Sequence, residues 1–93
     1  TLAIVPDDAV FEKTISNIEE IKARKGPVIA IATTGNTQIK ELADDGLWIP
    51  KAIEPMAAIL AIIPMQLLAY YVGVAKGYNV DRPRNLAKSV TVE

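Results

Sequence analysis

Apolar residues in the first half of the chain form short continuous runs, and these runs alternate with a segment of helical periodicity. Residues 2–5 and 28–32 are apolar without interruption and have the length of buried strands. The segment between them repeats apolar side chains at helical spacing, at Phe11, Ile15, Ile18 and Ile21. Gly26 and Pro27 end that pattern. The order strand, helix, strand is therefore predicted.

Turn-forming residues separate these elements. The cluster at residues 6–8 offers Asp7 or Asp8 as the cap of the first helix. The turn at residues 33–36 leads into a short helix, which Asn36 or Thr37 would cap. Acidic residues and a glycine break this helix, and residues 47–49 follow as a third short strand.

Alternation of strands and helices predicts an α/β fold with a parallel sheet. Continuous apolar runs are typical of strands that are covered on both faces. Three short strands make a poor free-standing sheet, because its edges and part of its faces would stay open. We therefore expect an incomplete domain, with further strands upstream of Thr1.

Residues 56–74 carry no charged side chain and form the longest apolar segment. One interpretation is a membrane span, with Tyr70 and Tyr71 at the interface. The favoured interpretation is a buried helix packed against a sheet and a partner helix at a subunit or domain interface. Pro64 and Gln66 lie within the segment, and Pro64 is expected to kink the helix or end its first half.

Composition restricts the available chemistry. The net charge is −1 and no acidic or basic block is present, so nothing favours nucleic acid or an anionic membrane as a partner. The chain has no cysteine, which excludes a disulfide framework and a thiolate nucleophile and fits a reducing cytoplasm. It also has no histidine, the commonest general base and metal ligand. We expect neither a metal nor a cofactor.

Helical periodicity disappears after Gly77, which divides the chain into a domain segment, residues 1–77, and a tail, residues 78–93. The tail keeps several apolar residues that predict packing against another surface, namely Leu86, Ala87, Val90 and Val92. Its last thirteen residues, 81–93, read DRPRNLAKSVTVE.

That ending resembles the C-terminal signature of the glucosamine-6-phosphate synthases. Residues 12–24 and 66–71 resemble the same family, whereas Lys25 and Trp48 depart from its pattern. The resemblance implies the C-terminal part of the second sugar isomerase (SIS) domain. Such a domain is a flavodoxin-like, three-layer αβα structure with a parallel sheet, here incomplete and followed by an irregular tail.

The resemblance also implies a function. The family aminates fructose 6-phosphate with ammonia released from glutamine and forms glucosamine 6-phosphate. Its members are cytoplasmic homodimers with a glutaminase domain upstream in the same chain, and this segment alone would be inactive. The alternatives are a non-catalytic SIS module that binds a sugar phosphate or regulates, and a membrane-anchored α/β domain.

Four tail residues match functional positions of the family. Lys88 takes the place of the lysine that forms a Schiff base with open-chain fructose 6-phosphate. Ala87 would offer backbone contacts to the sugar, and Leu86 and Ala87 would line the ammonia passage. Arg84 resembles a residue that couples the two halves of the enzyme, with a surface salt bridge as the alternative. Without the motif, Lys88 would be interpreted as a solvated tail lysine.

The turn at residues 33–36 follows a strand and precedes a helix, a position at which backbone amides can hold a phosphate. The favoured interpretation is an ordinary capped turn. The resemblance assigns the phosphate to an earlier SIS domain, outside this chain.

Overall fold

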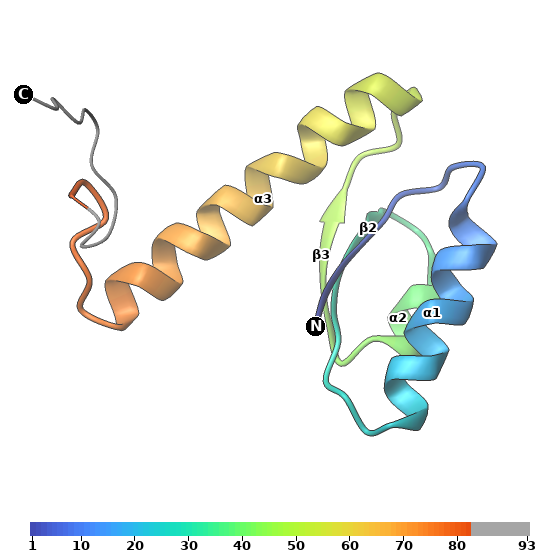
Figure 1. Cartoon of the computed structure of the whole chain (residues 1–93). Helices are drawn as coiled ribbons and strands as arrows, with labels where there is room; N and C mark the ends of the chain where they lie inside the picture. Colours follow the sequence, from blue (N-terminus) through green and yellow to red (C-terminus); the bar gives the residue numbers. More distant parts are fainter. Residues whose placement is uncertain (83–93) are drawn as a thin grey trace, which may run out of the picture.

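The computed structural model describes residues 1–82 of the chain. Strands and helices alternate along these residues (Figure 1). The elements are β1 (Leu2–Val5), α1 (Phe11–Ala23), β2 (Ile29–Thr33), α2 (Thr37–Leu42), β3 (Asp45–Ile49) and α3 (Glu54–Ala75). The predicted α/β class is confirmed, and the arrangement agrees with an incomplete SIS domain.

The three strands form one parallel sheet in the order β1-β2-β3. Ala3 pairs with Ala30 of β2, and Ile31 pairs with Leu47 of β3. β2 is the central strand and is buried from Ala30 to Thr33. β1 and β3 form the two edges of the sheet within residues 1–82.

Helices α1 and α2 cover one face of the sheet and form the main core with it (Figure 1). Ile15 and Ile18 are buried, while Phe11 and Ile21 pack at the margin of the core, so the helical spacing identified the correct face of α1. The buried members of this cluster are Val5, Ile15, Ile18, Val28, Ala30, Ala32 and Ile39.

Helix α3 packs against the opposite face, but only through part of its length. Ala61 contacts the buried side chains of Ile31 and Ile49, and Leu60 and Met65 pack around them. The remaining apolar positions of this face are exposed in residues 1–82, at Leu2, Ile4, Ile29 and Leu47. The expectation of strands covered on both faces therefore holds for β2 from Ala30 onward and not for the two edge strands.

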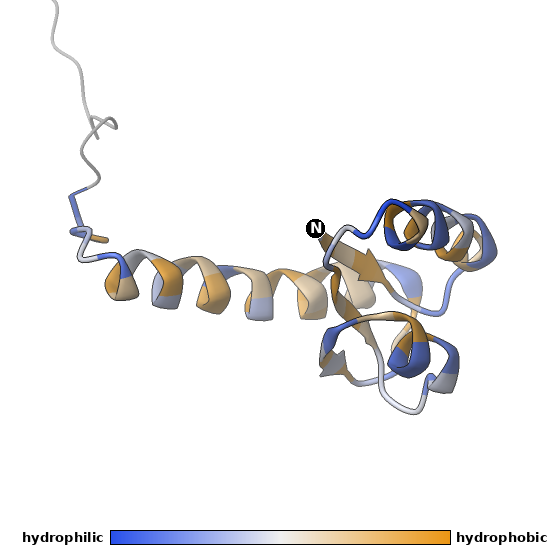
Figure 2. Cartoon of the chain, turned by 90° about the horizontal axis from the view of Figure 1, so that it is seen from below, coloured by the Kyte–Doolittle hydropathy of each residue, from blue (hydrophilic) through white to orange (hydrophobic). Residues whose placement is uncertain are grey.

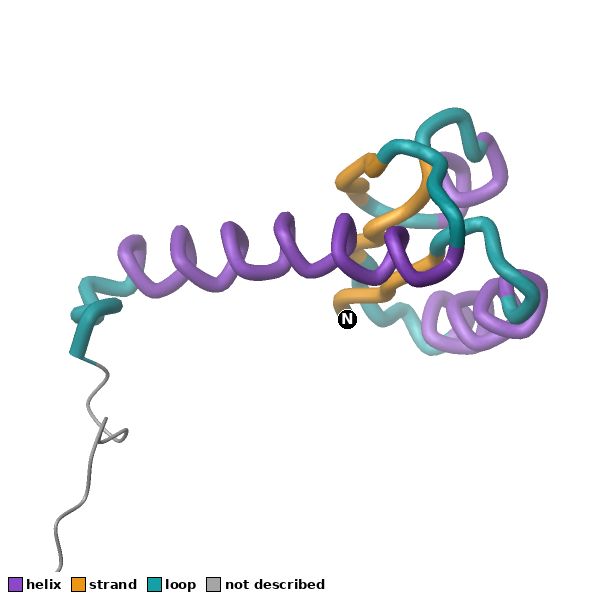
Figure 3. Tube along the Cα trace, turned by 90° about the horizontal axis from the view of Figure 1, so that it is seen from above, coloured by secondary structure: helices purple, strands orange, loops and turns teal. Residues whose placement is uncertain are grey.

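The second half of α3 extends away from the sheet (Figure 2). Pro64 does not end the helix, which runs without interruption through 22 residues (Figure 3), so the expected end at that position is wrong. The length and composition of α3 would allow it to cross a membrane, but the core helix of a soluble protein can have the same length and composition. Only 11% of its most apolar window is buried in residues 1–82. Burial of the whole helix is thus not found within the described part.

The helix ends differ in detail from expectation. Asn36 caps α2 as predicted, since its Oδ1 accepts a hydrogen bond from Ile39 N at 3.0 Å. Neither aspartate caps α1, because the helix begins after Val10, and Asp8 Oδ1 accepts from the amide of Val10 itself at 3.0 Å. At the far end of α1 the residue with positive φ is Lys25, at 60°, rather than Gly26.

Strand β3 is longer than predicted. Asp45 and Gly46, expected to belong to a helix-breaking turn, are its first two residues. They pair with Ile29 and Ala30 of β2, so strand pairing outweighs their local preference for turns.

Candidate functional site

The tail residues that the family resemblance selects, Arg84, Leu86, Ala87 and Lys88, lie outside the described residues. Their roles, and the division of the chain at Gly77, therefore stay predictions. The structure instead defines the surroundings of the sheet's carboxyl edge.

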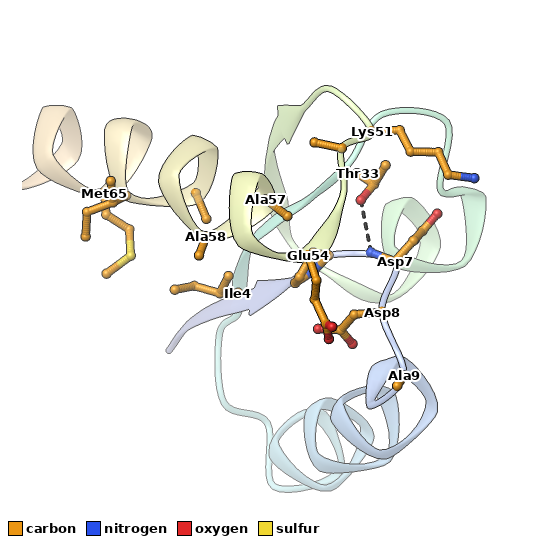
Figure 4. Close-up of a pocket in the computed structure, with 14 residues that line it drawn as sticks. Ile4, Asp7, Asp8, Ala9, Thr33, Lys51, Glu54, Ala57, Ala58 and Met65 are labelled. Carbon is orange, nitrogen blue, oxygen red and sulfur yellow. Dashed lines mark hydrogen bonds between the residues drawn. The ribbon is translucent and has the colours of Figure 1, made fainter.

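A cavity of about 540 Å³ lies where the three strands end (Figure 4). Its polar lining lies in or next to the three strand-to-helix connections, at Asp7, Asp8, Thr33, Lys51 and Glu54. Its apolar wall includes Ile4 and the first turns of α3, at Ala57, Ala58, Ala61, Ile62 and Met65. The volume falls in the range of small-molecule sites, of order 300–1,000 Å³.

The topology explains why these groups meet. Parallel strands end at one edge of a sheet, and ligands of open α/β sheets bind outside that edge. Asp7 and Asp8 come shortly after β1, Thr33 is the last residue of β2, and Lys51 comes shortly after β3. This cavity was not predicted from the sequence, although a polar residue at or after the end of each strand was a usable signal.

Hydrogen bonds hold the β1–α1 loop against the end of β2. The amide of Asp7 donates to the Oγ1 of Thr33 at 3.0 Å, and the Nδ2 of Asn36 donates to the Oδ1 of Asp7 at 2.9 Å. Thr33 is only 4% exposed. The carboxyl groups of Asp8 and Glu54 both point into the cavity (Figure 4).

The cavity carries an excess of negative charge. Its lining includes three carboxylates and one ammonium group. Within residues 1–82 the ion pair joins Lys22 to Asp44, so none of the charged cavity residues takes part in an ion pair there. No group of three or more acidic residues in the described part has a geometry that could hold a metal ion.

The turn at residues 33–36 is a capped turn rather than an open anion site. Thr34 donates to the carbonyl oxygen of Ile49 through both its amide, at 2.8 Å, and its hydroxyl, at 3.1 Å. The side chain of Asn36 is already hydrogen-bonded to Ile39 and Asp7. The helix that follows has six residues. The structure thus agrees with the favoured interpretation from sequence.

The fold and the cavity define an α/β segment of the kind that binds small molecules at the carboxyl edge of a parallel sheet. No protein-family model matches the chain. Individual relatives do, and many of them are named glutamine–fructose-6-phosphate aminotransferase (isomerizing). That of Caldanaerobacter subterraneus is 50% identical over 92 residues, 99% of this chain. That of Bacteroides thetaiotaomicron is 51% identical over the same length.

The relative from Thermus thermophilus is 54% identical over 84 residues, 90% of this chain. Similarity to isomerizing glutamine–fructose-6-phosphate aminotransferases thus extends over nearly the whole chain, and the resemblance predicted from the sequence is confirmed. The chain spans only 14–15% of the length of these relatives.

Proposed function

We propose that this chain is part of a longer enzyme that makes glucosamine 6-phosphate from fructose 6-phosphate and glutamine-derived ammonia. The observation that carries the proposal is identity of about half the residues over 99% of the chain to aminotransferases of that name. The segment would belong to the second SIS domain, with residues 78–93 as a tail that enters the sugar site.

Lys88 is the proposed catalytic residue. Its amine adds to the ketone carbon of open-chain fructose 6-phosphate, and loss of one water forms the imine. Only a neutral amine can attack, so the site must favour the unprotonated lysine. Ala87 contacts the sugar through its backbone, and no cofactor is required.

Ammonia reaches the sugar from the glutaminase domain in this proposal. Leu86 and Ala87 line its passage, because an apolar wall excludes water and keeps ammonia unprotonated. Arg84 couples the glutaminase and isomerase halves.

The open apolar faces of residues 1–82 support membership of a larger assembly. Exposed side chains of β1, β3 and α3 exceed the scattered apolar residues of an ordinary monomer surface. We propose that the rest of the SIS domain and the second subunit of a cytoplasmic homodimer cover them. On this view α3 contacts protein rather than lipid.

Replacement of Lys88 tests the function. In the complete protein, Lys88→Ala should abolish glucosamine 6-phosphate formation while glutamine hydrolysis stays detectable. Lys88→Arg should have the same effect, because a guanidinium stays protonated and forms no imine. Lys13→Ala, an exposed change on α1, is the matched control and should retain both activities. Wild-type sugar amination in either Lys88 variant would refute the assignment.

Chemical trapping gives a second readout. Borohydride reduction in the presence of fructose 6-phosphate should attach the sugar covalently to the peptide that contains Lys88. Attachment at another lysine, detected by peptide mass spectrometry, would move the catalytic role away from the tail.

A further inference from the structure

Residues 77–82, here called the exit turn, lead from the end of α3 toward the proposed catalytic residue, Lys88. We propose that Asn79 is a positioning residue for sugar amination. Its side chain fixes the exit turn and thereby limits where the Lys88 amine can lie. This role rests on the function proposed for Lys88, and it adds a residue that precedes the ending by which the chain resembles its family.

Helix α3 ends in a tight, hydrogen-bonded turn. The amide of Tyr78 donates to the carbonyl oxygen of Gly73 at 2.9 Å. The amide of Gly77 donates to that of Val74, also at 2.9 Å. Gly77 has a φ of 75°, the left-handed conformation on which this kind of helix end depends. The chain therefore leaves the helix in a defined direction.

Two further contacts continue this order beyond the helix. An added Cβ at Gly73 would lie 3.1 Å from the Cγ1 of Val80, so Val80 packs closely on the last turn of α3. The Oδ1 of Asn79 accepts hydrogen bonds from the amides of Asp81 and Arg82, each at 3.0 Å. An asparagine side chain can close a turn in this way because it replaces a backbone acceptor. Within residues 1–82 no other side chain hydrogen-bonds to the exit turn, so its conformation depends on Asn79.

The position of the exit turn matters because little chain separates it from the reacting amine. Lys88 lies six positions beyond Arg82. Six residues span at most about 20 Å even when fully extended, so the place of Arg82 restricts the volume that the amine can reach. Reaction rates fall steeply when a reacting group is poorly placed. Freedom in the exit turn would lower the fraction of molecules in which the amine can attack the ketone carbon.

Replacement of Asn79 in the complete protein tests this role. Asn79→Ala should lower kcat for glucosamine 6-phosphate formation about three- to tenfold, as expected for the loss of two exposed hydrogen bonds. KM for fructose 6-phosphate should stay within about twofold, because the lost bonds position the amine and do not hold the sugar. Covalent attachment of the sugar to the Lys88 peptide under borohydride should slow by the same factor as kcat. Glutamine hydrolysis without sugar, and the melting temperature, should stay as in the wild type.

Matched variants separate positioning from a general structural role. Asn79→Asp keeps an acceptor oxygen in place and should restore most of the rate, whereas Asn79→Gln moves the amide by one methylene and should be as slow as Asn79→Ala. Asn17→Ala removes an exposed amide on α1 and should change nothing. A wild-type rate in Asn79→Ala, an equal loss in Asn79→Asp, or a parallel fall in melting temperature would overturn the role of Asn79. Each of these results would leave the function proposed for Lys88 standing, because Lys88→Ala decides that function independently.

Discussion

Asp44 connects three parts of the chain through one carboxyl group. Its Oδ1 accepts from the Nζ of Lys22 in α1 at 2.7 Å, and its Oδ2 accepts from the amide of Val28 at 2.7 Å, just before β2. The hydrogen bond from Lys22 is the largest cause that holds the pKa of Asp44 below its ordinary value of 3.8, followed by the bond from Val28.

A depressed carboxyl pKa predicts a direction for the effect of pH on stability. The stabilising contribution of Asp44 is fully present above its unfolded pKa and is lost as the pH falls through the lower folded pKa. Asp44→Asn should therefore weaken the fall in stability between about pH 5 and pH 2. Denaturant unfolding at several pH values measures this slope.

Two further variants make the measurement specific. Lys22→Ala removes the largest cause of the pKa shift and should also flatten the slope. Lys13→Ala, on the same helix without an ion pair in residues 1–82, should leave it as in the wild type. An unchanged slope in both Asp44→Asn and Lys22→Ala would show that Asp44 does not contribute in this way.

Some residue-level features could be predicted from the sequence, and others could not. The Asn36 cap could be predicted, because the bond depends on a local preference of asparagine. The role of Asp44 could not, since its partners lie 22 and 16 positions away along the chain. Lys88 was selected by motif similarity alone, because chemistry by itself does not distinguish it from any other tail lysine.

Individual elements follow sequence periodicity closely, and their ends follow it less well. The spacing of Ile15 and Ile18 identified the buried face of α1. Pro64 removes one backbone donor and crowds the preceding turn, yet α3 continues beyond it. The cavity at the carboxyl edge was predictable in principle from the parallel sheet. Its acidic lining needed the position of Glu54 at the start of α3 as well.

The end of α1 predicts an unusual stabilising substitution. Lys25 has a φ of 60°, and its amide and that of Gly26 bond to the carbonyl oxygens of Lys22 and Ile21 at 2.8 and 2.9 Å. A left-handed residue other than glycine costs roughly 1–2 kcal/mol. Lys25→Gly should therefore raise the free energy of unfolding, by about 0.5–1 kcal/mol once the entropy of glycine is counted.

A lysine-to-glycine substitution inside α1 should change the free energy of unfolding in the opposite direction. Lys13→Gly, inside the helix, should lower the free energy of unfolding by about 1 kcal/mol. Urea denaturation of the two variants and the wild type measures both changes in the free energy of unfolding. A loss of stability in Lys25→Gly would mean that the positive φ of Lys25 carries no strain. Gly26 does not tolerate a side chain in the same way, because an added Cβ would lie 2.7 Å from the Cγ2 of Ile21.

At the scale of the whole molecule, helix α3 leaves a stripe of apolar side chains exposed in residues 1–82. The stripe repeats every three or four residues along one side of the helix, at Ile59, Ile63, Leu67, Tyr70 and Val74, all exposed. The sheet-facing side carries the buried Ala57 and Ala61 instead. A helix with two apolar sides is typical of one enclosed between two layers.

The proposed assembly makes this stripe a buried surface, and lysine substitutions test it. Ile63→Lys combined with Leu67→Lys should lower the melting temperature of the complete protein by several degrees or dissociate its subunits, because a buried ammonium group must be desolvated. Gln38→Lys introduces a charge of the same sign at an exposed polar position on α2, away from the stripe, and should change neither property. Thermal unfolding measures the melting temperature, and sedimentation velocity measures the association of the subunits. If the stripe were lipid-facing, the wild-type protein would sediment with membranes and the double variant would be released. If it were solvent-exposed, all variants would behave alike, and the proposal that protein covers α3 would fail.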